Sequence, residues 1–173
     1  QRQQLAILSA IETAKVEGGT VLCGGSAPTS PDIVNGYYIQ PTVIDGLQRE
    51  SELSSKEIFG PVVTLHPVRD MTDALQLANE SEYGLTSAIH TRNVDRAMWF
   101  TQRVRTGVVN INSGTFGSEP HMPFGGFDAS SNGTREPGVE ALDVYSELKN
   151  ITLLVRESEL NLPLRLPESK LSI

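Results

Sequence analysis

The spacing of apolar residues predicts an N-terminal helix followed by a strand. Between residues 3 and 15, apolar side chains recur every three or four positions, which is the pattern of an amphipathic helix. These apolar residues are Leu5, Ile7, Leu8, Ile11 and Ala14. The segment Glu17-Gly18-Gly19 predicts the end of the helix, because Gly readily adopts the left-handed conformation of a C-cap. Residues 20–23 then form a short run that predicts a strand.

The following positions predict extended chain and then a regular alternation of strands and helices. Residues 37–39 and 42–44 are extended around Pro41, which places this stretch at a sheet edge or outside the hydrogen-bond ladder. From Pro61 onward, short apolar runs alternate with amphipathic segments. The runs predict strands at 62–65, 86–90 and 108–111, and the amphipathic segments predict helices at 71–79 and 94–104. The predicted fold class is therefore α/β, with a βαβαβ parallel open sheet and right-handed crossovers.

A long polar loop follows the third strand of this unit. Residues 107–138 begin with the apolar run and become rich in Gly, Pro, Ser and Asn, with Phe116 and Phe124 among the glycines. A loop of this length inside a domain is uncommon and is usually functional or disordered. Because ligands of parallel sheets lie outside the carboxyl ends of the strands, we expect the loop to face a ligand. A surface loop fixed by its two Phe side chains is an equally open interpretation.

The last part of the chain predicts a helical turn at 138–143 and a long strand at 145–155. Ile151, Leu153 and Val155 alternate along this strand and share one of its faces. The strand has no evident neighbour in the βαβαβ unit, so two interpretations stay open: it pairs with another subunit, or it joins the chain's own sheet. The tail that follows, up to residue 173, lacks periodicity and is expected to be extended or partly disordered.

Composition narrows the function classes. The chain has 173 residues, 38% of them hydrophobic and 20% charged, as in soluble globular proteins. With a net charge of -7 and no cluster of Lys and Arg, we expect neither nucleic acid nor an anionic membrane as a partner. The first residues, QRQQLAIL, show neither a signal-peptide pattern nor an initiator Met, and we expect part of a longer, cytoplasmic protein. The single cysteine, Cys23, allows no intrachain disulfide.

Several short motifs occur in an order that one known family shares. They are Val21-Leu22-Cys23-Gly24-Gly25, Gly36-Tyr37-Tyr38-Ile39-Gln40-Pro41-Thr42-Val43, Glu57-Ile58-Phe59-Gly60-Pro61-Val62, Asn79 with Tyr83-Gly84-Leu85-Thr86, Gly107-Val108-Val109-Asn110-Ile111-Asn112, Pro123-Phe124-Gly125-Gly126, Asn132-Gly133-Thr134-Arg135-Glu136, and residues 145–149. With these motifs in register, the chain resembles the C-terminal part of an NAD(P)-dependent aldehyde dehydrogenase. It departs from the family at Asp128, where Lys is usual, at Ser131, where Gly is frequent, and at Thr134, which looks inserted.

The resemblance implies a division of the chain into three parts. Residues 1–143 would be a partial catalytic domain, residues 144–155 an oligomerisation strand, and residues 156–173 an extended tail. The full-length protein would be a homo-oligomer, a dimer or a tetramer. By the same resemblance, Arg135 would pair with Glu147 and join the end of the long loop to the terminal strand near the subunit interface.

The resemblance also implies a chemistry of which this chain carries only part. The family oxidises an aldehyde to a carboxylic acid through a cysteine thioester, with NAD or NADP as the cofactor. Cys23 matches a structural motif of the family, so the nucleophile and the dinucleotide-binding domain would both lie upstream. We therefore expect no catalytic residue in this chain and no activity from the chain alone. Glu136 would stand behind the active site in a water-linked carboxylate network.

The resemblance places cofactor and substrate contacts in two segments. Glu57 would bind the nicotinamide ribose, since a carboxylate accepts hydrogen bonds from a diol, and Phe59 would pack beside the ring. The loop would contact the aldehyde through Thr115, Phe116, Gly117, Ser118 and Phe124. His121 has no second ligand at suitable spacing, so no metal site is expected. A different class of function stays open, namely a non-catalytic module that keeps the fold and acts by association.

Overall fold

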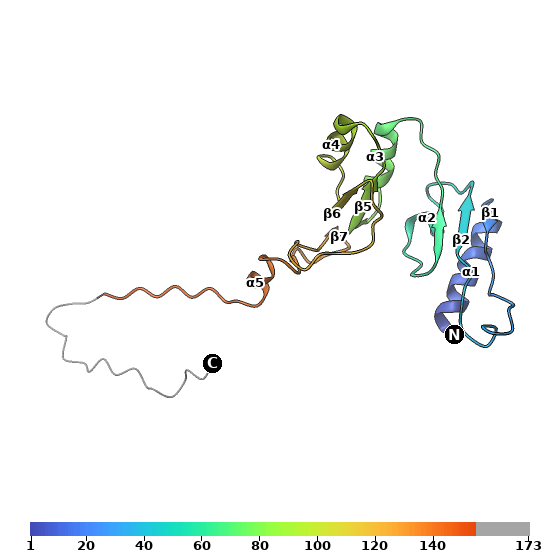
Figure 1. Ribbon diagram of the computed structural model, residues 1–173, viewed down its shortest axis with the longest axis horizontal. Helices are drawn as coiled ribbons and strands as arrows, with labels where there is room; N and C mark the ends of the chain where they lie inside the picture. Colours follow the sequence, from blue (N-terminus) through green and yellow to red (C-terminus); the bar gives the residue numbers. More distant parts are fainter. Residues whose placement is uncertain (155–173) are drawn as a thin grey trace.

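The computed structural model describes residues 1–154, which form two lobes followed by an extended segment (Figure 1). The first lobe, residues 1–66, contains α1 (Arg2–Val16), β1 (Thr20–Cys23), β2 (Thr42–Asp45), α2 (Glu52–Ser55) and β3 (Val62–Thr64). Its sheet has the order β1-β2-β3, with β1 and β2 antiparallel and β2 and β3 parallel. The predicted helix and the strand at 20–23 are confirmed.

The core of the first lobe lies between α1 and the sheet. Ile7, Ile11 and Ala14 of α1 are buried, while Leu5 on the same predicted apolar face is 58% exposed. The three buried side chains of α1 pack against Ile44 of β2 and against two later leucines, Leu47 and Leu53. Such burial removes apolar surface from water and is the main stabilising term for the lobe.

The expectation for Pro41 is wrong with respect to residues 42–44. They lie in β2, which is the central strand of the sheet and has a neighbour on each side. Pro41 immediately precedes this strand, so its missing N–H interrupts no ladder. The ladder begins at the next residue, where the backbone N–H of Thr42 donates to Pro61 O at 2.8 Å. Residues 37–39 belong to no strand.

The second lobe, residues 67–138, holds a βαβ unit and the long loop. It contains α3 (Met71–Asn79), β4 (Tyr83–Gly84), β5 (Thr86–Ile89), α4 (Val94–Thr101), β6 (Val108–Ile111) and β7 (Phe127–Asp128). β5 and β6 are parallel and in register from Thr86 opposite Val108, and α4 forms the crossover between them. The side chains of Asp70 and Asn93 cap α3 and α4, which is why both helices begin where the apolar pattern predicts.

The predicted three-stranded βαβαβ sheet is wrong in its pairing. β3 pairs with β2 in the first lobe, and among residues 1–154 the strands form three small sheets rather than one. The alternation of strands and helices and the α/β class are confirmed, and both β2–β3 and β5–β6 are parallel. Periodicity identifies an element but not its partner, and here β2 reaches the edge of β3 from earlier in the chain. Two further short strands, β4 and β7, pair with each other across the loop.

An ion-pair cluster joins the two lobes. Asp73 of α3 is 5% exposed, and its carboxylate accepts from Arg49 Nη2 at 2.9 Å and from the Arg69 backbone N–H at 3.0 Å. Arg69 Nε adds a contact at 3.3 Å. The backbone N–H of Arg69 and then the guanidinium of Arg49 lower the pKa of Asp73 to about 2. Arg49 belongs to the first lobe, so the Asp73 carboxylate links the two lobes. We call the cluster of Asp73, Arg49 and Arg69 the clasp.

The clasp predicts a stability that depends on pH in the acid range. Because the pKa of Asp73 is lower in the folded chain, its ionised form stabilises the fold above the unfolded value of 3.8, and this contribution is lost as pH falls towards 2. We expect Asp73→Asn to unfold more readily at neutral pH and to show a flatter acid profile. Urea unfolding of both proteins between pH 7 and 2 measures this. Asp32→Asn is the control, and an unchanged acid profile in Asp73→Asn contradicts the assignment.

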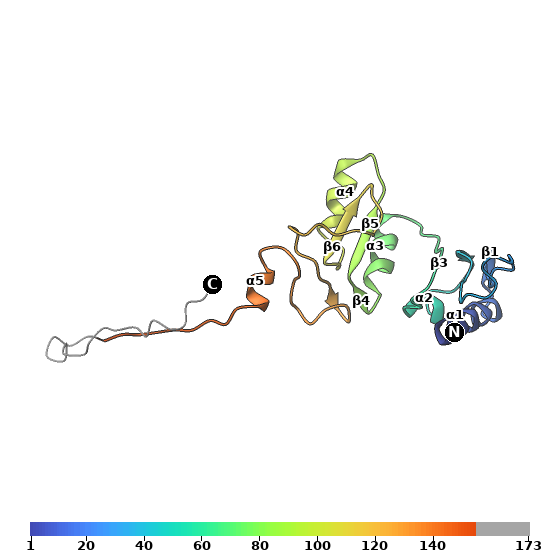
Figure 2. The same ribbon diagram turned by 60° about the horizontal axis from the view of Figure 1, so that its bottom comes forward.

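Beyond the lobes, the chain runs away from both sheets. α5 (Ala141–Val144) confirms the predicted helical turn, and residues 145–154 continue as an extended segment that projects outward (Figures 1 and 2). Up to residue 154 this segment pairs with no strand, so it does not join the chain's own sheet in this structure. Leu148, Ile151, Leu153 and Leu154 are exposed on it. Val155 and the predicted tail at 156–173 lie outside the described residues.

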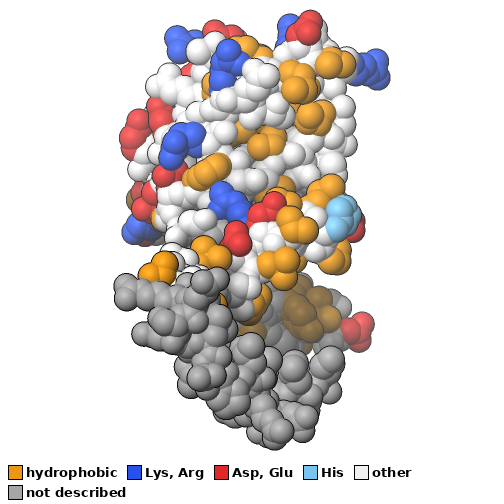
Figure 3. Space-filling view, turned by 90° about the vertical axis from the view of Figure 1, so that its left-hand side faces the viewer, with side chains coloured by type: hydrophobic (Ala, Val, Ile, Leu, Met, Phe, Trp, Pro, Cys, Tyr) orange, Lys and Arg blue, Asp and Glu red, His pale blue; other side chains and the backbone are white. Residues whose placement is uncertain are grey.

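The end of the molecule from which this segment projects carries many hydrophobic side chains. In Figure 3 they are spread over this face among acidic and basic groups. Across both lobes, exposed apolar side chains include Val16, Phe59, Val94 and Phe116. No helix of the described part of the chain is long and apolar enough to cross a membrane.

Candidate functional site

The long loop is held at both ends against β6. The chain leaves β6 at Ile111 and returns at Gly125 and Gly126, next to Gly107, which immediately precedes the same strand. A Cβ atom on Gly107 would lie 1.7 Å from Gly125 O, so the two backbones touch where only Gly fits. β7 then pairs with β4, and Gly107 N donates to Gly84 O at 3.0 Å. The loop is therefore closed by backbone contacts at its base.

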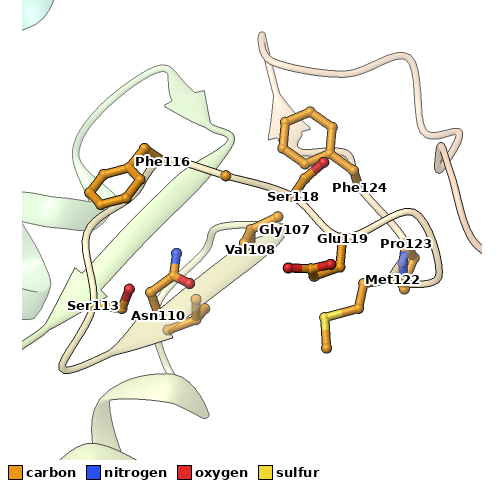
Figure 4. A pocket seen from close by; sticks show the side chains of 12 residues that line it. Gly107, Val108, Asn110, Ser113, Phe116, Ser118, Glu119, Met122, Pro123 and Phe124 are labelled. Atoms are coloured by element: carbon orange, nitrogen blue, oxygen red, sulfur yellow. The ribbon is translucent and has the colours of Figure 1, made fainter.

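Between this loop and β6 lies a cavity of about 450 Å³, which we call the loop hollow (Figure 4). Four of the five predicted substrate residues line it: Phe116, Gly117, Ser118 and Phe124. A smaller hollow of about 340 Å³ shares the last three of these and adds Thr115, with Leu85 and Thr86 on its other side. The structure thus brings all five predicted substrate residues around two adjoining cavities.

From the strand order, we expected the ligand site beyond the carboxyl end of the third strand. The loop hollow lies elsewhere. It follows β6 from Gly107 to Asn110, because the loop turns back over the strand instead of continuing outward. The base contact between Gly107 and Gly125 enforces this return. The hollow is concave and has the volume of a typical ligand pocket, which favours the interpretation of the loop as ligand-facing over that of a plain surface loop.

Among the lining residues that the sequence did not single out are Asn110, Glu119 and Met122. Asn110 is the one polar residue of the apolar run in β6, and that departure was a usable signal. Its Nδ2 atom is buried and forms no hydrogen bond within residues 1–154. Figure 4 shows the Glu119 carboxylate extending from the loop into the hollow, with the Met122 thioether beside it. Nothing in the spacing of Glu119 or Met122 distinguished them from ordinary loop residues.

Glu57 and Phe59 lie on the turn between α2 and β3. Gln3 of α1 fixes this turn by donating from Nε2 to Ile58 O at 2.9 Å and to Phe59 O at 3.3 Å. Phe59 has a φ of 53° and is 78% exposed, which for an aromatic residue is a strained and unburied state. Both residues line a hollow of about 320 Å³.

Glu57 also faces the second lobe. It lines a further cavity of about 600 Å³ whose other wall includes Tyr83, Leu85 and Thr86. Leu85 and Thr86 are the residues that border the smaller loop cavity from its other side. Glu57 and the loop therefore flank the same short segment at the start of β5, although they come from different lobes. The sequence placed both groups in a site but gave no measure of their separation.

The remaining predicted residues are not drawn into these cavities. Glu136 is exposed, and its backbone N–H donates to Phe124 O at 2.7 Å, so the main chain rather than the carboxylate touches the loop. Arg135 donates to Thr134 O at 2.9 Å and lies 5.2 Å from the Phe127 ring centroid. Arg135 and Glu147 form no ion pair among the described residues, so the predicted pair is wrong for this single chain. Their interface role stays a prediction.

The family departures at the end of the loop have local partners. Asp128, where Lys is usual, accepts from Arg105 Nη2 at 2.9 Å and fastens β7 to the chain before β6. Ser131 accepts from Gly133 N at 3.0 Å, and Asn132 Oδ1 accepts from Thr134 N at 3.1 Å. Residues 131–134 therefore form a self-contained turn.

Cys23 lies apart from the candidate site. It is exposed at the end of β1, where its thiol is 3.8 Å from Pro41 O, and it lines neither the Glu57 cavities nor the loop hollow. Its neighbours Gly24 and Gly25 have positive φ and form the turn that ends the strand. Within residues 1–154, no group of three His, Cys, Asp or Glu side chains could hold a metal ion.

Comparison with known proteins assigns the fold and this loop to one class. A family model described as "Aldehyde dehydrogenase family" matches residues 1–151. The alpha-ketoglutaric semialdehyde dehydrogenase of Bacillus subtilis is 38% identical over 144 residues, which cover 83% of this chain and 30% of that protein. The mitochondrial aldehyde dehydrogenase of Equus caballus is 38% identical over 150 residues, which cover 86% of this chain and 29% of that protein.

Solved structures agree with this assignment. The betaine aldehyde dehydrogenase of Staphylococcus aureus, in complex with NAD+, has a TM-score of 0.79 at 32% identity, covering 84% of this chain and 28% of that one. The aldehyde dehydrogenase of Mycobacterium tuberculosis, complexed with NAD+, has a TM-score of 0.77 at 33% identity, covering 84% and 29%. The chain belongs to the aldehyde dehydrogenase family. It spans about 30% of the length of the curated relatives that it matches.

Proposed function

We propose that this chain supplies the substrate loop, one cofactor contact and an assembly strand to an NAD(P)-dependent aldehyde dehydrogenase. In this proposal it is the C-terminal part of the catalytic region, and the complete protein oxidises an aldehyde to a carboxylic acid. The observation that carries the proposal is the convergence of all five predicted loop residues on adjoining cavities, next to the cavity that Glu57 lines. Below, "assembled enzyme" means the protein in which a family N-terminal part precedes this chain.

The turn at Glu57 fits a nicotinamide nucleotide. Its carboxylate forms no hydrogen bond or ion pair with residues 1–154, lies at the border of two cavities and can accept both hydroxyls of a ribose. The exposed Phe59 ring offers an apolar face beside it. Two similar structures were solved with NAD+. The bound nicotinamide would supply the hydride acceptor, while Glu57 would hold its ribose and Phe59 would limit its position.

The loop would hold the aldehyde and keep water from its tail. Phe116, Phe124 and Met122 give the hollow an apolar wall, and Ser118 with Asn110 adds hydrogen-bonding groups. Orientation of this kind contributes to rate because the reacting carbon is held near the nucleophile. The thiolate would come from the upstream part of the assembled enzyme. The exposed Cys23 is not placed to supply it.

Assembly and location complete the proposal. Residues 145–154 project with exposed apolar side chains and unpaired backbone, as a strand that adds to a neighbouring subunit would. We infer a homo-oligomer, a dimer or a tetramer, with Arg135 and Glu147 near its interface. The cytoplasm is the proposed location, although named relatives also include mitochondrial and chloroplastic enzymes.

The Glu57 contact is tested in the assembled enzyme. Glu57→Gln keeps the shape of the side chain and removes its charge, and we expect the KM for the dinucleotide to rise about tenfold through loss of a charge-assisted hydrogen bond. Steady-state rates of NADH or NADPH formation measure this. Glu50→Gln, an exposed acid in the same lobe, is the control and is expected to leave the KM unchanged. An unaltered KM in Glu57→Gln would remove this residue from the cofactor site.

A non-catalytic association module is the second candidate. The exposed apolar segment at 145–154 favours it, since such a segment can bind a partner without any chemistry. The two candidates differ in one result: the module predicts that the complete protein binds a partner chain and forms no reduced dinucleotide with any aldehyde. Dehydrogenase activity of the assembled enzyme excludes the module.

A further inference from the structure

The loop hollow carries one kind of charge. Among the described residues that line it, Glu119 is the only ionisable side chain, and neither Lys nor Arg is present. Glu119 takes part in none of the ion pairs of residues 1–154, so its negative charge is not neutralised within this part of the protein. A ligand tail in this hollow therefore meets a negative potential.

Two aromatic rings line the same hollow as this carboxylate. In Figure 4, the loop carries Phe116 on one side of Glu119 and Phe124 on the other, and all three line the same hollow. The Phe116 ring is 83% exposed, so its face is not covered by the described residues. The face of an aromatic ring attracts a cation, and the attraction is strongest for groups that are weakly hydrated, such as quaternary ammonium ions.

The Asn110 amide on the β6 side of the hollow favours a ligand tail that contains polar atoms. The Asn110 amide has a buried nitrogen without a hydrogen bond in residues 1–154, and a purely hydrocarbon tail would leave that group unsatisfied. The amide thus favours a tail with polar atoms, whichever way its oxygen and nitrogen are turned. The amide selects polarity, and the carboxylate that lines the same hollow selects the sign of the charge.

We propose that the loop hollow selects aldehydes whose tail carries a positively charged nitrogen, and that Glu119 is the residue that sets this preference. The proposal rests on the proposed function, because it treats the loop hollow as the substrate site. It assigns Phe116 and Phe124 to the cation through their ring faces and Glu119 to its charge. An anionic tail, such as that of a dicarboxylic semialdehyde, is disfavoured by repulsion.

Binding to the 173-residue chain tests the charge preference directly. The probes are choline, its uncharged carbon isostere with a tert-butyl group, and hydroxybutyrate, three alcohols of similar size that differ in charge. The readout is the side-chain amide signal of Asn110 in NMR titrations, identified by its loss in Asn110→Ser. We expect choline to bind about tenfold more tightly than the isostere, with the difference shrinking at high salt, and hydroxybutyrate to bind most weakly.

Matched variants separate Glu119 from the general acidity of the chain. Glu119→Gln is expected to reduce the preference for choline over its isostere to within about twofold. Glu140→Gln, a nearby acid that does not line the hollow, is expected to keep the full preference. Equal binding of choline and the isostere to the unchanged chain overturns the proposal, and so does a preference that survives Glu119→Gln.

Turnover by the assembled enzyme distinguishes failure of this inference from failure of the proposed function. With betaine aldehyde, its uncharged isostere and succinic semialdehyde as substrates, we expect kcat/KM to be highest for betaine aldehyde and to lose that rank in Glu119→Gln. If succinic semialdehyde is the best substrate, the charge preference is wrong and the dehydrogenase function stands. If the chain selects choline but the assembled enzyme reduces no dinucleotide, the proposed function is wrong and the cation site stands.

Discussion

The 173-residue chain alone is expected to oxidise aldehydes at least about 10⁴-fold more slowly than the assembled enzyme, which places it at the background rate. The reason is that, in the proposed function, the nucleophile belongs to the upstream part of the assembled enzyme. The only thiol of the chain, Cys23, is exposed at the end of β1 and lines none of the cavities around Glu57 or the loop. Absorbance of the reduced dinucleotide, with purified chain, aldehyde and NAD+, measures this rate.

A cysteine variant provides the control for this experiment. In the assembled enzyme, Cys23→Ser is expected to change kcat by less than about twofold, since a surface thiol without an activating partner is not a nucleophile. A dinucleotide signal from the chain alone that disappears in Cys23→Ser would show that Cys23 reacts after all. It would also place the catalytic centre in the first lobe, contrary to the geometry of the loop.

Gly107→Ala is expected to destabilise the second lobe by about 3 kcal/mol and to open the loop hollow. The new methyl group would lie 1.7 Å from Gly125 O and 3.0 Å from Gly126 Cα, and both are main-chain atoms that have no rotamer to change. The strand start and the loop end must therefore separate. Urea unfolding measures the loss of stability, and protease cleavage within residues 113–122 reports the opening of the loop.

Gly133→Ala is the matched control for Gly107→Ala. Gly133 has a φ of 98°, but a Cβ atom there would meet nothing within 4 Å. Its substitution is expected to cost about 1 kcal/mol from backbone strain alone and to leave the loop closed. If the two variants unfold at the same urea concentration, close packing of Gly107 against Gly125 does not hold the loop.

One helix and one strand show how much of the fold can be predicted from the sequence. The helix over residues 71–79 and the strand over 108–111 were predicted with the bounds that the structure has. The capping side chain of Asp70 and the short apolar run after Gly107 are local features of the sequence. Features of this kind can be recognised in a single sequence. The pairing of β3 with β2 could not be predicted in this way. It joins residues that are 20 positions apart in the sequence, such as Thr42 and Val62, and it depends on the packing of α1 against the sheet.

Some residues of the candidate site were likewise predicted from the sequence, and others were not. Family motifs identified Phe116, Phe124 and Glu57 as contacts, and two of these three now line the same hollow. Asn110 and Glu119 were not predicted as site residues, because their roles depend on their surroundings. The Asn110 amide is buried without a partner within residues 1–154, and the Glu119 carboxylate lines a hollow together with two aromatic rings. The expected Arg135–Glu147 pair failed in the single chain because residues 145–154 run away from the loop instead of returning to it.

By itself, the sequence determined the class of protein, most of the helices and strands, and the loop that bears the site. Each of these follows from residue spacing or from motifs, which act over a few neighbouring positions. Only the tertiary structure decided which strands pair, where the loop turns back and which charge faces the hollow. These are consequences of contacts between distant segments, such as Gly107 on Gly125 and Asp73 on Arg49, and no local pattern specifies them.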